Sequence, residues 1–336
     1  MADANMEWAE LPRKCLATIL SHLPCILDHI MFSGVCKRWR TVAGRNLPLM
    51  QPWLLMPSTS ATSFFCVACG HTHQGPRMPD CARGARLCGS FLGGWLAAAD
   101  IPGTSGPPLP WNRAPAMLNL CTGERVDLPR SLLGNNPGVT NINFFHVITF
   151  SAYYAAATVS GKPNIVFWRG DMSSWTPPML KWDAPMKKWK KLLPKDPIED
   201  VKYFVISPLG NGFHVLTNRE DLLVYTPNTN DKRRELTMSS VERYRVRKNP
   251  SPTMPEPGEV LARFLVVSRG KMLMVVKFVS SENATVAFDV FRLDRQQPPS
   301  WSLKKVPLDT LTDRSIFLKR GCSVSLDDSP RYLLPG

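Results

Sequence analysis

Proline is unusually common in this chain, which has 31 prolines in 336 residues, whereas a typical protein has about 5%. Proline lacks a backbone N–H and has a fixed φ, so it is disfavoured inside helices and central strands. We therefore expect many loops and short elements, and no long helical bundle beyond the N-terminal segment. The hydrophobic fraction of 44% and the charged fraction of 20% are typical of a folded globular chain.

The first 45 residues show helical spacing of apolar side chains. Leu11-Pro12 is typical of a helix start, and Leu16, Ile19, Leu20 and Leu23 lie on one face of the helix that follows. Pro24 ends this helix. We expect a second helix, capped by Asp28, whose stripe is made of Met31, Val35, Trp39 and Val42. Helices this short are marginal alone, so they dock on the chain's own second domain or on another protein.

The residues of this segment resemble the F-box motif over about 40 positions. The matching residues are Trp8, Leu11-Pro12, Leu16, Ile19, Leu23, Asp28, Phe32 and the string Val35-Cys36-Lys37-Arg38-Trp39-Arg40. The resemblance implies a small helical module that binds a Skp-type adaptor, which links it to cullin and RING subunits of a ubiquitin ligase. It also implies the adaptor-binding residues, which are Leu11, Pro12, Leu16, Ile19, Leu23, Val35, Cys36, Trp39 and Arg40.

Past Pro52 the pattern changes to short β-rich runs separated by Gly, Pro, Asn and Asp. Adjacent runs are expected to pair; examples are 213–216 with 222–225, and 165–168 with 189–194. Radial stacking of such sheets into a propeller protects their edges. The predicted fold is therefore mostly β with a small N-terminal α-helical module: F-box helices over 1–50 and a β-propeller-like substrate-recognition domain over 51–336. A β-sandwich or an irregular mixed sheet is the alternative.

The β-rich part resembles the large plant F-box group whose C-terminal half is a kelch-like domain of unknown function. The resemblance rests on short strings such as Gly93-Gly94-Trp95-Leu96-Ala97, Ser268-Arg269-Gly270-Lys271 and Phe288-Asp289-Val290-Phe291-Arg292-Leu293. It implies a recognition surface with no agreed ligand. Members of the group continue past the segment that matches Gly321-Cys322-Ser323 into a further strand pair, whereas this chain stops at Gly336. The last blade is therefore expected to be incomplete.

The net charge of +14 concerns partners rather than fold. Part of it lies in two basic runs, 181–195 and 232–248. A solvated basic surface is the favoured interpretation, since no nucleic-acid-binding motif accompanies the runs. A nucleic-acid or chromatin binder is the alternative.

The string Cys66-Val67-Ala68-Cys69-Gly70-His71-Thr72-His73 contains one Cys-x-x-Cys pair. Such a pair can hold zinc, with His71, His73 or Cys81 completing a tetrahedral set. The spacing matches no standard zinc finger. Ordinary thiols in a loop, with no metal, are therefore the favoured interpretation, and zinc is the alternative.

No motif for catalysis or cofactor binding is present. The chain has no phosphate-binding glycine loop, no His-Glu-x-x-His helix and no nucleophile elbow. Cys36 is better interpreted as a small buried hydrophobic residue than as a nucleophile. We expect no signal peptide at the N-terminus, and the longest apolar stretch, 147–159, is too short to span a bilayer. We expect a non-enzymatic subunit of a ubiquitin ligase in the cytoplasm or nucleus, without cofactor or membrane contact, that recruits an unidentified target protein. A degenerate F-box protein without ligase function is a further alternative, because of the short C-terminus.

Overall fold

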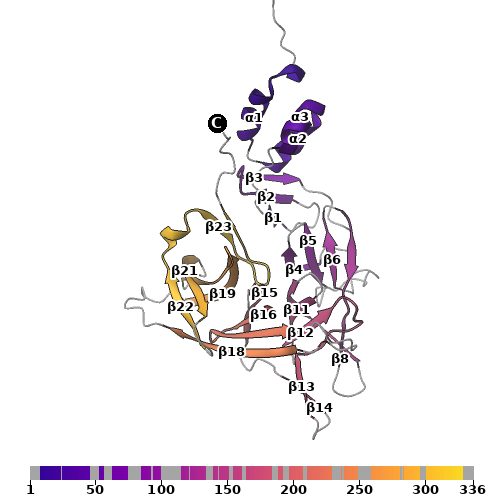
Figure 1. The fold of residues 1–336 in the computed structure, drawn as a ribbon, viewed down its shortest axis with the longest axis vertical. Coiled ribbons are helices and arrows are strands. Elements are labelled where there is room, and N and C mark those ends of the chain that lie inside the picture. The colour runs from indigo at the N-terminus through magenta and orange to yellow at the C-terminus, as the bar shows by residue number, and fades with distance from the viewer. Residues whose placement is uncertain are drawn as a thin grey trace, which may run out of the picture. The chain divides into compact units, whose positions relative to one another are not determined.

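The computed structural model describes residues 8–327, with gaps at 24, 46–52, 57–62, 75–84, 92–93, 100–114, 121, 134–138, 143, 151–153, 161–163, 184–187, 192–196, 207–209, 229–235, 237, 249–258, 281, 283 and 296–299. The chain forms two compact units (Figure 1). Unit 1 is Met1–Met78 with Leu326–Gly336, and unit 2 is Pro79–Ser325. The helices and a small sheet therefore belong to the same unit, and the other sheets belong to unit 2 except for the last two residues of the final strand. The predicted boundary at residue 50 stays a prediction.

Unit 1 begins with a 3-10 turn and three helices. They are η1 (Trp8–Glu10), α1 (Arg13–Ser21), α2 (Ile26–Gly34) and α3 (Lys37–Arg45). Pro12 is the N-cap residue of α1, and its carbonyl accepts the first helical hydrogen bond from the Leu16 N–H at 3.1 Å. The predicted start of the first helix is thus confirmed.

The prediction of one continuous second helix was wrong. The chain breaks at Val35-Cys36 into α2 and α3, and the Val35 N–H donates to the Phe32 carbonyl only three residues back. The break between α2 and α3 lets the Trp39 ring pack against the Phe32 ring, with 4.4 Å between the ring centroids. Asp28 also does not cap α2, since Cys25 is the N-cap residue and Asp28 lies in the first turn.

The helices enclose a small apolar core of their own. Trp39 is 9% exposed, and its indole N–H donates to the Trp8 carbonyl at 3.1 Å, which ties η1 to α3. The remaining buried members come from all three helices and are Leu16, Leu20, Phe32, Val42 and Ala43. The stripe predicted on α1 is therefore partly buried within the module.

A three-stranded antiparallel sheet completes the described part of unit 1. Its order is β1-β2-β3, with β1 (Trp53–Met56), β2 (Ser63–Cys66) and β3 (His71–Gln74). The turn between β2 and β3 closes through the Gly70 N–H, which donates to the Cys66 carbonyl at 2.9 Å. Gly70 has a φ of 71°, which glycine adopts without a steric penalty.

Unit 2 consists of antiparallel sheets built from neighbouring strands. One has four strands, β4 (Arg86–Phe91), β5 (Trp95–Ala99), β6 (Ala116–Asn119) and β7 (Arg125–Asp127). Another has three, β10 (Phe145–Phe150), β11 (Tyr154–Val159) and β12 (Ile165–Arg169). Two-stranded sheets are formed by β8 (Ser131–Leu133) with β9 (Val139–Asn141), and by β13 (Met179–Asp183) with β14 (Lys188–Lys191). The expected pairing of 165–168 with 189–194 was wrong, because β12 pairs with β11 and β14 pairs with β13.

The largest sheet joins two four-stranded meanders edge to edge (Figure 1). The first is β15 (Ile198–Ile206), β16 (Gly210–Thr217), β17 (Asp221–Pro227) and β18 (Met238–Lys248). The second is β19 (Glu259–Ser268), β20 (Lys271–Val279), β21 (Thr285–Arg295) and β22 (Ser300–Val306). Strands β18 and β22 pair in parallel, whereas every other pair in the sheet is antiparallel. The predicted pairing of 213–216 with 222–225 is confirmed as β16 with β17.

The chain after β22 contains η3 (Leu308–Leu311) and a two-stranded sheet of β23 (Arg314–Phe317) and β24 (Val324–Asp327).

The core of unit 2 is aromatic at its centre. The Phe167 ring lies 5.4 Å from Phe213 and 5.2 Å from Tyr225, measured between centroids. Trp175 is fully buried and donates its indole N–H to the Pro129 carbonyl at 2.6 Å, so its polar atom is satisfied.

Candidate functional site

The helical module divides the predicted adaptor-binding residues into a buried and an exposed set. Leu16 and Trp39 are buried; Leu11, Ile19, Leu23 and Cys36 are half-buried; Pro12, Val35 and Arg40 are exposed. The Arg40 guanidinium Nε–H donates to the Ser33 carbonyl at 3.3 Å, which links α3 to α2. The buried set thus builds the module, and the exposed set is available to a partner. Binding by these residues stays a prediction.

The module also exposes large apolar side chains, of which sequence reasoning assigned only Val35 to adaptor binding. Met31 is 75% exposed, Trp8 71%, Ile30 57% and Val35 55%. Met31 and Val35 are four residues apart at the end of α2, so they lie on the same face, and Ile30 is adjacent. The sequence placed Met31 and Val35 on the apolar stripe of the expected second helix, but it assigned only Val35 to adaptor binding. Clustered exposed apolar side chains are typical of an interaction site.

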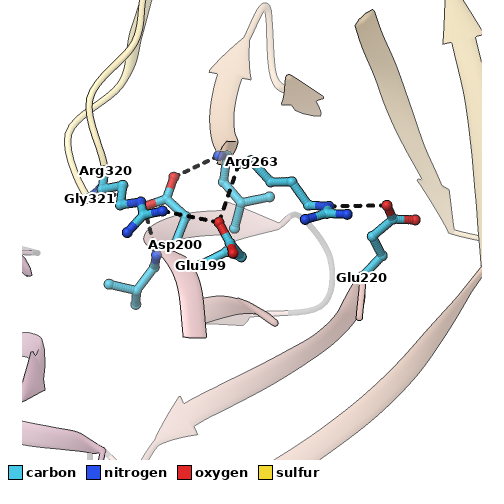
Figure 2. Close-up of polar contacts among 8 residues, drawn as sticks. Glu199, Asp200, Glu220, Arg263, Arg320 and Gly321 are labelled. Atoms are coloured by element: carbon cyan, nitrogen blue, oxygen red, sulfur yellow. Dashed lines mark hydrogen bonds and ion pairs between the residues drawn. The ribbon is translucent and has the colours of Figure 1, made fainter. Parts of the chain in front are cut away.

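Unit 2 contains a buried polar network around Asp200 on β15, which Figure 2 shows. Its carboxylate accepts backbone N–H groups from Val201 at 2.8 Å, Leu265 at 2.7 Å and Gly321 at 2.5 Å. The ammonium of Lys202 donates to the Ser323 carbonyl at 2.7 Å, and burial lowers its pKa. Asp200 therefore joins β15, β19 and the loop after β23.

Ion pairs surround this centre. Arg263 donates to the Glu220 carboxylate at 3.1 Å, and Arg320 donates to the Glu199 carboxylate at 3.2 Å. The Glu199 carboxylate also accepts the Arg263 backbone N–H at 3.4 Å (Figure 2). The Asp200 carboxylate links β15, β19 and the loop after β23 through three hydrogen bonds, so the network is suited to holding these segments together.

Burial raises the pKa of Asp200 to about 7, although the three N–H donors and Lys202 lower it. This value lies above the ordinary aspartate pKa of about 3.9, so the folded chain holds this proton more firmly than the unfolded chain. The stabilisation it provides is fully present below about pH 4 and is lost as pH rises to about 7. The free energy of unfolding of the parent and of Asp200→Asn is measured by urea denaturation between about pH 4 and pH 7. We expect the parent's value minus the variant's value to fall as the pH rises. A flat or rising difference would contradict the assignment.

The structure brings three of the candidate zinc-binding residues together. Cys66, Cys69 and His73 lie with Cys25, a residue that sequence reasoning did not consider, and all four ligand atoms are within 4.8 Å of one another. His71 is exposed and outside this group, and Cys81 lies outside the described residues. Burial raises the pKa of Cys25 to about 11. Burial opposes ionisation of Cys66 too, but hydrogen bonds from Cys69 and Ala68 hold its pKa below the ordinary value.

The two basic runs give no structural support for nucleic-acid binding. The lysine and arginine side chains of 181–195 and 232–248 lie outside the described part of the structure. Within the described residues, no helix has both the length and the apolar character needed to cross a membrane.

Comparison with family models assigns both parts of the chain. Residues 8–48 match the F-box domain, and residues 64–334 match the KIB1-4 beta-propeller. The chain belongs to the KIB1-4 beta-propeller family. A search of curated proteins found no match. Membership in the KIB1-4 family confirms the propeller fold over the sandwich alternative, and the F-box match confirms the assignment of the N-terminal helices. The kelch-like character and plant origin stay predictions.

This KIB1-4 propeller protein thus carries an F-box domain at its N-terminus. F-box domains bind Skp-type adaptors, so the helical module is the candidate functional site of the chain. The propeller is the candidate surface for a second partner, because loops on a rigid β frame commonly carry recognition.

Proposed function

We propose that this protein is a substrate-recruiting subunit of a Skp–cullin–F-box ubiquitin ligase. The observation that carries the proposal is the union of an F-box domain at 8–48 and a propeller at 64–334 in one chain. The helical module binds the Skp-type adaptor, and through it the cullin and RING subunits. The propeller binds the target protein, and the cytoplasm or nucleus is the compartment where such a complex works.

In this proposal the chain supplies proximity rather than chemistry. Holding a target beside the ubiquitin-conjugating enzyme makes transfer effectively unimolecular. The buried ionisable groups around Asp200 fit this role, because they hydrogen-bond to the chain itself. They stabilise the frame that presents the target.

The exposed apolar face at the end of α2 supports adaptor binding. Met31, Val35 and Ile30 are all more than half exposed, and burying them against a partner is favourable by about 25 cal/mol per Å² of apolar surface. A few contacts near the centre of an interface carry most of its affinity, and Met31 is the most exposed side chain of this apolar face. Met31 and Val35 are therefore the residues at which this proposal is tested.

We expect the double variant Met31→Asp/Val35→Asp to bind a Skp-type adaptor at least about 100-fold more weakly than the parent, because two charges would be buried against an apolar surface. Binding is measured by calorimetry with the full chain. Thr18→Asp, an exposed change on α1, is the matched control and should bind like the parent. An unchanged affinity of the double variant, with the parent binding, would show that the adaptor uses another face. No binding by the parent would overturn the ligase role.

A further inference from the structure

Four side chains of unit 1 come together from the end of β2, the β2–β3 turn, strand β3 and the start of α2. The His73 Nε2 atom lies 3.0 Å from the Cys69 sulfur and 3.4 Å from the Cys25 sulfur. All four ligand atoms, including the Cys66 sulfur, are within 4.8 Å of one another. Cys25 and Cys66 are buried, and Cys69 and His73 are half-buried.

These distances fit a tetrahedral zinc ion. Zinc binds thiolate sulfur at about 2.3 Å and imidazole nitrogen at about 2.0–2.1 Å, which places neighbouring ligand atoms about 3.5–3.8 Å apart. The two nitrogen–sulfur distances, 3.0 and 3.4 Å, are somewhat shorter than this, and all four ligand atoms lie within 4.8 Å of one another. The set of three sulfurs and one imidazole nitrogen is that of a structural Cys3His site, and soft thiolate ligands select zinc over harder cations.

The backbone of the β2–β3 turn is shaped to hold two thiolates. The turn spans Cys66 to Gly70 and closes by the Gly70 N–H bond to the Cys66 carbonyl, with Gly70 at positive φ. Backbone N–H groups of Ala68 and Cys69 donate toward the Cys66 sulfur. Such donors stabilise a thiolate and hold it in place for a metal.

The third sulfur comes from the start of a helix. Cys25 is the N-cap residue of α2, so its sulfur lies at the end of the helix where the helix dipole favours a negative charge. Cys25 is 48 residues from His73 in the chain, so the four residues meet only in the folded unit.

We propose that Cys25, Cys66, Cys69 and His73 bind one zinc ion that ties the start of α2 to the β2–β3 turn. Cys25 lies within the F-box match, and the other three lie within the propeller match. The ion therefore cross-links the two family regions of the chain inside unit 1. Its binding free energy contributes directly to the stability of this unit, as it does for structural zinc sites in general.

The test is the metal content of the full chain, purified without chelator. We expect about one zinc per chain by elemental analysis. Replacing zinc with Co²⁺ should give the intense visible ligand-field bands of tetrahedral cobalt and the near-ultraviolet charge-transfer bands of cobalt thiolate. Addition of a chelator should lower the melting temperature of the parent.

Two pairs of variants locate the ligands. Cys25→Ser and His73→Asn should each weaken zinc binding by more than the 10–100-fold that loss of a group merely orienting a ligand causes. The controls are Cys15→Ser, which changes an exposed cysteine of α1, and His71→Asn, which changes the exposed histidine on the same strand as His73. Both controls should keep the zinc content of the parent.

The cobalt spectrum of the parent tests the proposed metal site even where a ligand variant fails to fold. A parent that takes up neither zinc nor cobalt, or that binds cobalt without thiolate charge-transfer bands, overturns the proposal. Stoichiometric iron in place of zinc overturns the identity of the metal. Loss of metal in His71→Asn but not in His73→Asn overturns the ligand set. None of these outcomes depends on adaptor binding.

Discussion

Replacing Trp39 with alanine is expected to unfold the helical module, and adaptor binding is lost with it. Trp39 is almost fully buried, packs against Phe32 at 4.4 Å and donates to the Trp8 carbonyl. Truncating a large buried aromatic side chain costs about 3–5 kcal/mol, which is most of the stability that so small a core provides. Hydrogen exchange of residues 8–45 in the full chain, followed by mass spectrometry, measures the change directly.

Two controls separate the core role of Trp39 from a contact with the adaptor. Trp39→Phe keeps a ring against Phe32 but loses the indole N–H, and should cost about 1 kcal/mol. Val35→Ala changes a residue that is 55% exposed and should leave exchange unchanged, within about 0.5 kcal/mol. If Trp39→Ala lost adaptor binding while its helices stayed protected from exchange, Trp39 would be a direct contact, and the core assignment would be wrong.

Asp200→Ala is expected to destabilise the propeller unit by about 3–5 kcal/mol, the usual cost of removing one partner from a buried charged network. The change leaves the N–H groups of Val201, Leu265 and Gly321 without their acceptor, and each such group carries a desolvation penalty. The Lys202 ammonium, whose pKa burial already lowers, loses a nearby negative charge. Urea denaturation of the full chain, monitored by buried tryptophan fluorescence, measures the loss.

Asp171→Ala is the matched control for this experiment. The Asp171 side chain is 65% exposed and pairs with Arg169 at the surface, and exposed ion pairs contribute less than about 1 kcal/mol. Equal destabilisation by both variants would mean that the Asp200 network does not hold β15, β19 and the loop after β23 together. An Asp200→Ala variant as stable as the parent would lead to the same conclusion about the network.

Features that depend on neighbours in the chain could be predicted from the sequence. The start of α1 at Pro12 and the burial of Leu16 and Leu20 follow from helical spacing and from the missing N–H of proline, and both are local effects. Pairing of β16 with β17 follows from two β-rich runs separated by a short turn. The F-box module was identified in another way, from the resemblance of an ordered string of residues to a known family motif.

Features that depend on distant partners could not be predicted. The spacing of Met31, Val35, Trp39 and Val42 suits one continuous helix. The break between α2 and α3 is stabilised by tertiary contacts such as that between Phe32 and Trp39. The parallel pairing of β18 with β22 requires two separate meanders to meet at their edges. The hydrophobic periodicity along one strand does not indicate which distant strand will pair with its free edge.

The polar centres show the same division. Composition and spacing showed the Cys66-x-x-Cys69 pair, but Cys25 reaches that pair only because α2 begins beside the β2–β3 turn. Asp200 accepts N–H groups that lie 65 and 121 residues further along the chain. Local physics thus defined elements such as the start of α1 and the β16–β17 pair, and family resemblance identified the F-box module. Long-range packing chose the partners of the buried aspartate and cysteines, because a side chain's burial and contacts are properties of the assembled fold.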